Sequence, residues 1–182
     1  MEMASATLIS VDEYLSTSYR PDCDYVDGAL MERNVGEWDH SRLQSLLLGF
    51  FLGLESRRGI MAVTEQRVQV KPSRYRVPDV CVVSASAPRE QILTHPPLLC
   101  IEILSKDDTM SAMYERIGDY LEFGVPCVWV VDPRTRRAWT FTSEGMREAA
   151  GGVLEIADPG IRVPLAELFQ SMTEPKRQLP SM

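Results

Sequence analysis

The sequence of 182 residues has no apolar run long enough to span a bilayer. The apolar run LLLGFFLGL falls well short of the roughly 20 residues that a transmembrane helix needs. The N-terminal residues MEMASATLIS also lack the basic region that precedes the apolar part of a secretory signal. We therefore expect a cytoplasmic protein that does not enter a membrane.

Paired cysteines are also absent. The four cysteines lie far apart and none forms a C-x-x-C pair, which argues against a zinc site. Free cysteines inside apolar runs behave as small hydrophobic residues and suit a reducing compartment such as the cytoplasm. The sequence contains no internal repeat and no low-complexity tract, so a repeat architecture is not expected.

Basic residues are outnumbered by acidic ones. The chain has 19 Lys and Arg against 26 Asp and Glu, which gives a net charge of −7. Proteins that coat nucleic acid are usually basic, so we do not expect that class. A nuclease remains open, because catalytic carboxylates add negative charge and a local basic patch can coexist with an acidic whole.

The apolar pattern predicts one domain of mixed α/β (α+β) type. We expect strands and helices in an irregular order, with too few helices for a doubly wound parallel sheet. A mixed sheet flanked by helices fits better, formed by residues 1–170 and followed by a flexible tail at 171–182. The expected helices are 9–15, 40–57, 109–123 and 164–169; the expected strands are 66–70, 77–83, 98–105 and 125–131, with hairpins around Asp27-Gly28 and between 138–142 and 152–156.

One acidic residue stands inside an apolar strand. The run LLCIEILS at 98–105 is typical of a strand buried on both faces, yet it contains Glu102. An isolated buried carboxylate is costly, so Glu102 must be protonated, paired with a cation or bound to a metal ion. The alternative is an edge strand with Glu102 in water.

Asp79 poses the same problem in the run VPDVCVV. If the two runs are neighbouring strands, both carboxylates can converge on one side of the sheet. Converging carboxylates bind Mg²⁺ or Mn²⁺, and such an ion can orient a water molecule and offset charge on a phosphoryl oxygen. On this interpretation a divalent ion, rather than a side chain, is the partner of Glu102.

A cation commonly accompanies such a pair, and two residues are candidates. Lys106 shares the strand parity of Glu102 but lies where the strand should already have ended. Arg116 lies at the border of the apolar face of the predicted helix 109–123, so it can point at the carboxylates. The alternative for Arg116 is a surface arginine paired with acidic neighbours on its own helix.

Two further residues precede the acidic pair in the chain. Asp24 lies in the predicted hairpin and is either a further member of the site or a turn-forming aspartate. His40 opens the predicted long helix, where a histidine is more often a capping or packing residue than a catalyst.

Several short motifs occur together in one order: DYVDG, His40 at a helix start, PDV, IEILS, YLEFGVP and WVVDP. This ordered set, over about residues 8–170, resembles the Uma family of restriction endonuclease-like proteins, which is abundant in bacteria. The resemblance implies the restriction endonuclease-like fold of PD-(D/E)xK nucleases. It also implies Asp79 as the aspartate of the PD element and Glu102 as the acid of the next strand.

The resemblance places the family's catalytic lysine in the helix, four residues before a tyrosine, where this sequence has Arg116. Arginine keeps the charge and can hold a phosphate through two hydrogen bonds, but it does not deprotonate. The family's glutamate before the hairpin turn is matched by the shorter Asp24. These two departures leave open a protein of this fold with reduced or lost cleavage.

Three functional hypotheses follow. The first is a Mg²⁺- or Mn²⁺-dependent nuclease acting on nucleic acid, DNA in the first instance, through Asp79, Glu102, Arg116 and Asp24. The second is a catalytically weakened or inactive protein of the same fold that acts as an interaction module, and the third is a hydrolase for a non-nucleic phosphoester. The run LLLGFFLGL is apolar on more than one helix face, which predicts either a homodimer or a central core helix.

Overall fold

The computed structural model describes residues 8–33, 37–149 and 151–173. Its centre is a six-stranded sheet with the order β10-β9-β8-β7-β6-β3. Strands β7 and β8 are parallel and the other neighbours are antiparallel, so the predicted mixed sheet is confirmed. The strands are β3 (Ile60–Thr64), β6 (Val80–Ser84), β7 (Leu99–Ile103), β8 (Val128–Asp132), β9 (Arg137–Thr142) and β10 (Gly145–Glu148).

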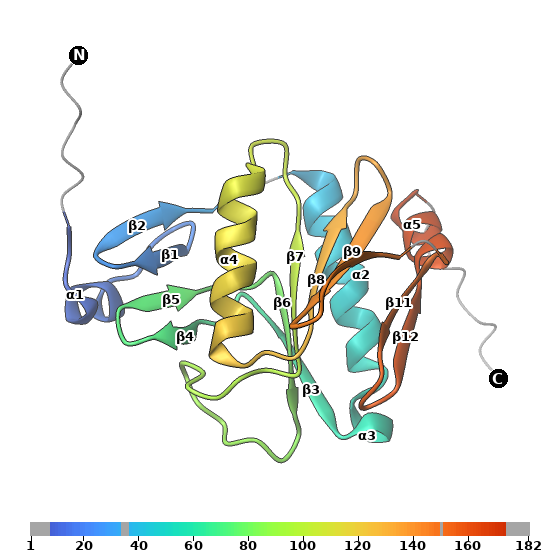
Figure 1. Ribbon diagram of the computed structural model, residues 1–182, viewed down its shortest axis with the longest axis horizontal. Coiled ribbons are helices and arrows are strands. Elements are labelled where there is room, and N and C mark those ends of the chain that lie inside the picture. The colour runs from blue at the N-terminus through green and yellow to red at the C-terminus, as the bar shows by residue number, and fades with distance from the viewer. Residues whose placement is uncertain (1–7, 34–36, 150, 174–182) are drawn as a thin grey trace.

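Helices cover both faces of this sheet, with α4 on one side of the central strands β6 and β7 and α2 on the other (Figure 1). A short helix, α3, follows α2, and α5 ends the described chain beside α2. The helices are α1 (Val11–Ser16), α2 (Trp38–Leu52), α3 (Glu55–Arg58), α4 (Met110–Phe123) and α5 (Leu165–Thr173). Within the described ranges, none of these helices combines the length and the apolar character needed to cross a membrane.

Two smaller sheets complete the fold. A four-stranded sheet, ordered β2-β1-β5-β4, lies on the same side of the molecule as α1, and β11 and β12 form a hairpin near α5 (Figure 1). The remaining strands are β1 (Cys23–Val26), β2 (Ala29–Glu32), β4 (Val68–Lys71), β5 (Arg74–Arg76), β11 (Val153–Ile156) and β12 (Ile161–Pro164).

The ends of several elements follow the sequence closely. Ser10 caps α1, because its hydroxyl accepts a hydrogen bond of 3.1 Å from the backbone N–H of Glu13. Asp27 and Gly28 form the predicted turn between β1 and β2 with φ values of 49° and 99°. Gly124 ends α4 in the left-handed conformation that a glycine adopts without strain.

The long helix predicted at 40–57 is wrong in its extent. The helix begins at Trp38 and ends at Leu52, and α3 forms a separate turn after Gly53. Glycine is among the poorest helix formers, so an interruption at Gly53 is reasonable. The predicted final helix at 164–169 is present and runs on to Thr173, and residues 174–182 of the predicted tail lie outside the described residues.

The predicted hairpin between 138–142 and 152–156 is also wrong. Strand β9 turns back through Gly145, at φ 122°, to pair with β10, while β11 pairs with β12. All four residues of β10 are exposed, so the strand has no apolar alternation by which it could have been predicted.

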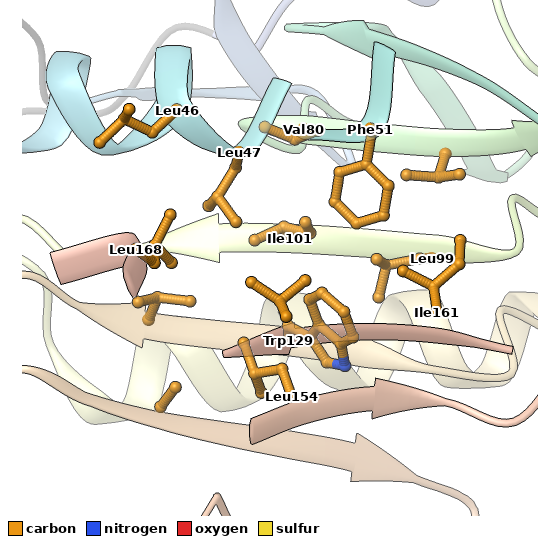
Figure 2. Packing of buried hydrophobic residues seen from close by; sticks show 14 of the residues in the cluster. Leu46, Leu47, Phe51, Val80, Leu99, Ile101, Trp129, Leu154, Ile161 and Leu168 are labelled. Atoms are coloured by element: carbon orange, nitrogen blue, oxygen red, sulfur yellow. The ribbon is translucent and has the colours of Figure 1, made fainter. Parts of the chain in front are cut away.

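The main core lies between α2, the sheet, and the β11–β12 hairpin with α5. In Figure 2, Leu47 and Phe51 of α2 point toward Ile101 of β7, and Trp129 of β8 packs near Leu154. The rings of Phe51 and Trp129 have their centroids 6.0 Å apart. Burying a large apolar side chain of this kind stabilises the fold by about 1.5–3 kcal/mol.

The apolar character of α2 on more than one face has an internal explanation. Leu46 and Phe50 line a small cavity together with Leu168 of α5, so α5 packs on a second side of α2. This matches the central core helix that was one of the two interpretations of LLLGFFLGL. The homodimer remains a prediction.

Candidate active site

Asp79 and Glu102 come to neighbouring positions at one end of the central sheet. Asp79 immediately precedes β6, and Val80 pairs with Ile101 of β7, so the next opposed positions are Asp79 and Glu102. Both residues are buried, with exposed fractions of 2% and 1%. The edge-strand alternative, with Glu102 in water, is therefore wrong, because all five residues of β7 are buried.

Asp79 has three partners from three parts of the chain. Arg33, which follows β2, places its Nη2 against the Oδ1 atom of Asp79. The backbone N–H of Ile103 donates a 2.7 Å hydrogen bond to Oδ2, and His40 Nε2 lies 3.3 Å from the same oxygen. Burial alone would raise the pKa of Asp79, but these partners outweigh it and lower the pKa.

Glu102 is held by two residues of α4, one turn apart. Arg116 Nη1 donates to Oε2 at 2.9 Å, and the hydroxyl of Tyr120 donates to Oε1 at 2.7 Å. Burial raises the pKa of Glu102, Arg116 opposes this effect, and the charge of Asp79 adds to it. The effect of Asp79 on Glu102 agrees with two carboxylates that lie close together.

These contacts correct the interpretation that a metal ion, rather than a side chain, is the partner of Glu102. In the structure Arg116 is its cation and Tyr120 is its second hydrogen-bond donor. Arginine at the border of the apolar helix face reaches inward because α4 lies directly on the sheet. Of the two candidate cations, Lys106 is 66% exposed and pairs instead with Glu37 at 3.5 Å.

Asp24 lies behind the pair, in a buried ionic network. Its Oδ1 accepts a 2.9 Å hydrogen bond from the N–H of Val77, and its Oδ2 accepts one of 3.1 Å from Arg76 Nη1. The same Oδ2 is 3.4 Å from Arg116 Nε. Asp24 therefore touches the site through Arg116, and its hydrogen bonds differ from those of a simple turn residue.

Arg76 connects this network to α4. It donates to Asp119 Oδ2 from Nε at 2.8 Å and from Nη2 at 2.6 Å. Arg76 and Asp119 have exposed side-chain fractions of 4% and 3%. The network ties the four-stranded sheet to the helix that carries Arg116, so it fixes the position of that side chain.

The sequence did not identify Arg33, and it ranked His40 as more often structural than catalytic. Arg33 follows a short strand and has no periodic partner, so nothing local indicated its contact with Asp79. His40 lies in the first turn of α2, and burial would lower its pKa, but the contact with Asp79 raises it. The only indication in the sequence that His40 belongs to the site was its order relative to the PDV motif.

A small pocket opens over the acidic pair. Its lining includes Arg33, His40, Asp79, Ser105, Asp108 and Arg116. Asp79 lines the pocket, although it is only 2% exposed. With a volume of about 20 Å³, the pocket has room for about one water molecule.

The chemistry of this donor set fits a hard divalent cation. Each carboxylate oxygen of Asp79 and Glu102 has one or two close polar partners. Since an ionised carboxylate offers about four lone-pair positions, each side chain keeps a position for a metal ion. Across residues 8–33, 37–149 and 151–173, no group of three or more His, Cys, Asp or Glu side chains is arranged to hold a metal ion.

Comparisons with known proteins agree with this geometry. A family model described as "Uma2: Putative restriction endonuclease" matches residues 11–172. A crystal structure described as that of "a putative nuclease belonging to DUF820 from Anabaena variabilis ATCC 29413" is 22% identical with a TM-score of 0.79, covering 90% of this chain and 99% of that one. This likeness confirms the predicted restriction endonuclease-like fold.

A second structure, of a DrdV–DNA complex, is 14% identical with a TM-score of 0.44. It covers 80% of this chain but only 12% of that one, and a likeness at this level carries no functional information. No curated protein matches the sequence.

Proposed function

The chain belongs to the Uma2 family, described as putative restriction endonucleases, and on this premise we propose that it is a metal-dependent nuclease that hydrolyses phosphodiester bonds. The observation that carries the proposal is the pair of buried carboxylates, Asp79 and Glu102, at opposed positions of two adjacent strands. Burying two acids on adjacent strands is costly, and such perturbed carboxylates cluster at functional sites.

Asp79 and Glu102 would hold Mg²⁺ or Mn²⁺. The ion would supply a water molecule of lowered pKa and charge to offset that of the phosphate. Arg116 holds Glu102 in place through its 2.9 Å hydrogen bond and favours the ionised form against the effect of burial, and Arg116 lines the pocket. Asp24 and Arg76 orient Arg116 and α4 from behind.

Nucleic acid, and DNA in particular, is the substrate class that we propose. The net charge of −7 requires that binding rely on local contacts and on the metal ion rather than on overall attraction. If several basic side chains contact the phosphate backbone of the nucleic acid, cleavage should fall steeply as the salt concentration rises. A homodimer in the cytoplasm of a bacterium completes the proposal.

The test is cleavage by the purified protein of supercoiled plasmid, single-stranded DNA and RNA, with Mg²⁺, Mn²⁺ or EDTA. We expect cleavage that EDTA abolishes and that Asp79→Asn and Glu102→Gln each reduce by at least about 100-fold, the scale of removing a metal ligand. Glu155→Gln, at an exposed position on β11, is the control and should keep full activity. Absence of cleavage on every substrate with either ion would refute the nuclease.

A second function is favoured by one specific feature. Both carboxylates of the pair are already matched by arginines, Arg33 and Arg116, which is the arrangement of a stable structural cluster. A protein that keeps the fold but lacks the chemistry would act as an interaction module. In that case Asp79→Asn would leave the cellular role of the protein intact while the fold is retained.

A further inference from the structure

Arg33 and Arg76 are both buried arginines beside aspartates, yet they are held very differently. Arg76 donates to Asp24, Asp119 and Glu115, so its hydrogen bonds reach three acidic partners. In the described part of the chain, Arg33 donates a hydrogen bond to Asp79 alone, and its Nη1 is buried without a hydrogen-bond partner, as is the Nε of Arg116. An arginine that leaves a buried donor unsatisfied is weakly held compared with Arg76.

The charges of the site indicate that one arginine must move, without distinguishing Arg33 from Arg116. Asp79 and Glu102 together carry −2, and Arg33 and Arg116 together carry +2, so the four groups are balanced before any ion binds. A divalent cation would leave an excess of +2 in a buried place, which is unfavourable at low dielectric. One arginine must therefore move away when the ion enters.

Arg116 is the less suited of the two to move. It lies within ion-pair distance of two acids, Glu102 at 2.9 Å and Asp24 at 3.4 Å, and it projects from the middle of α4. Arg33 lies outside regular structure directly after β2, has one acidic partner, and lines the pocket mouth with 12% of its side chain exposed. Its departure breaks one ion pair and needs no change in a helix.

We propose that Arg33 is the exchangeable counter-ion of Asp79: it occupies the Oδ1 position of Asp79 and is displaced when a divalent cation binds the acidic pair. This inference rests on the metal site of the proposed function and deepens it. The inference assigns Arg33 a regulatory role, because a divalent ion must compete with the guanidinium of Arg33 for the carboxylate of Asp79. In the metal-free protein each of the two carboxylates thereby has a guanidinium partner.

The first test is calorimetric titration of Mn²⁺ into wild-type protein, Arg33→Met and Arg33→Gln. Removing one positive charge from the immediate surroundings of a dication should tighten binding by about tenfold or more. Arg147→Met is the matched control, because Arg147 is 80% exposed on β10 and forms a surface ion pair with Glu144, so the Mn²⁺ affinity of this variant should equal that of the wild type. Unchanged or weaker Mn²⁺ binding in both Arg33 variants, with circular dichroism intact, would overturn the exchange.

A second measurement uses the wild-type protein and does not depend on any variant folding. In ¹⁵N-labelled protein, the Nε–H resonance of Arg33 should shift and exchange faster with water when Mg²⁺ is added, while that of Arg76 stays unchanged. An Arg33 resonance that is unmoved at saturating Mg²⁺ overturns the proposal.

The outcomes separate this inference from the proposed function. Tighter Mn²⁺ binding by Arg33→Met without cleavage of any nucleic acid would refute the nuclease and support the exchange. Metal-dependent cleavage with equal Mn²⁺ affinity in wild type and Arg33→Met would support the nuclease and refute the exchange. No Mn²⁺ binding by any of the proteins would refute both.

Discussion

Arg76→Met is expected to destabilise the protein strongly, since it removes the cation from the buried network behind the site. The substitution keeps most of the side-chain volume but leaves Asp24 and Asp119, which are 1% and 3% exposed, without their closest guanidinium. Removing one partner of a buried pair costs about 3–5 kcal/mol. Asp24 keeps the N–H of Val77, and Asp119 keeps Arg74 at 3.1 Å, so the lower end is appropriate.

The free energy of unfolding should fall by about 3 kcal/mol, which corresponds to a decrease in Tm of about 6–12 °C for a chain of this size. Urea unfolding followed by circular dichroism measures the first quantity and calorimetry the second. Arg162→Met, at an exposed arginine on β12, is the control and should change stability by no more than about 0.5 kcal/mol. A loss below about 1 kcal/mol for Arg76→Met would refute the reasoning about the network.

A double-mutant cycle separates the pair from its surroundings. Asp119→Asn removes the charge that Arg76 neutralises at 2.6 Å. If the two groups stabilise the fold through each other, the double variant should lose less than the sum of the single losses, by about 1–3 kcal/mol. Simple additivity would show that each residue acts through other contacts.

Three further outcomes are expected. Tyr120→Phe removes the donor at Glu102 Oε1 and should cost about 1–3 kcal/mol in urea unfolding; an unchanged midpoint would contradict this. Arg116→Lys should raise metal-dependent cleavage above that of the wild type, measured on plasmid, whereas an unchanged rate would argue against residue 116 as the site cation. Burial would raise the pKa of Asp132, but hydrogen bonds from the following turn lower it below the value of the unfolded chain. The stabilisation of the fold by Asp132 should therefore be present above about pH 4 and fade as the pH falls through the lowered pKa. Asp132→Asn should lose this pH dependence when acid unfolding is followed.

The sequence predicted the parts of the site that regular structure positions. Strand alternation placed Glu102 inside the sheet, and helical periodicity placed Arg116 at the inner border of α4, one turn from Tyr120. These positions follow from the period of two residues in a strand and of 3.6 residues in a helix, and both periods can be recognised in the local sequence. The roles of these residues in catalysis stay predictions.

The residues that the sequence missed are those whose partners lie far along the chain. Arg33 contacts an aspartate 46 residues away, from a position that belongs to no helix or strand. Strand β5 has the sequence RYR, in which Arg74 is half-buried and Arg76 is buried. The sequence did not predict this burial, because the acidic partners of the two arginines come from α4 and β1. No local pattern records such pairing, so only the tertiary structure reveals it.

The same long-range pairing explains how this chain tolerates acids in its core and what a ligand must do there. Glu102 and Asp79 are stable without a metal ion because guanidinium groups from α4 and from the end of β2 neutralise them. A divalent ion would therefore meet occupied carboxylates, and its affinity would depend on how easily a guanidinium departs. Arg116 lies within ion-pair distance of two acids and Arg33 of one, so a substitution at position 33 should change that affinity first. The acidic pair alone is thus not enough to predict how tightly this chain would bind an ion.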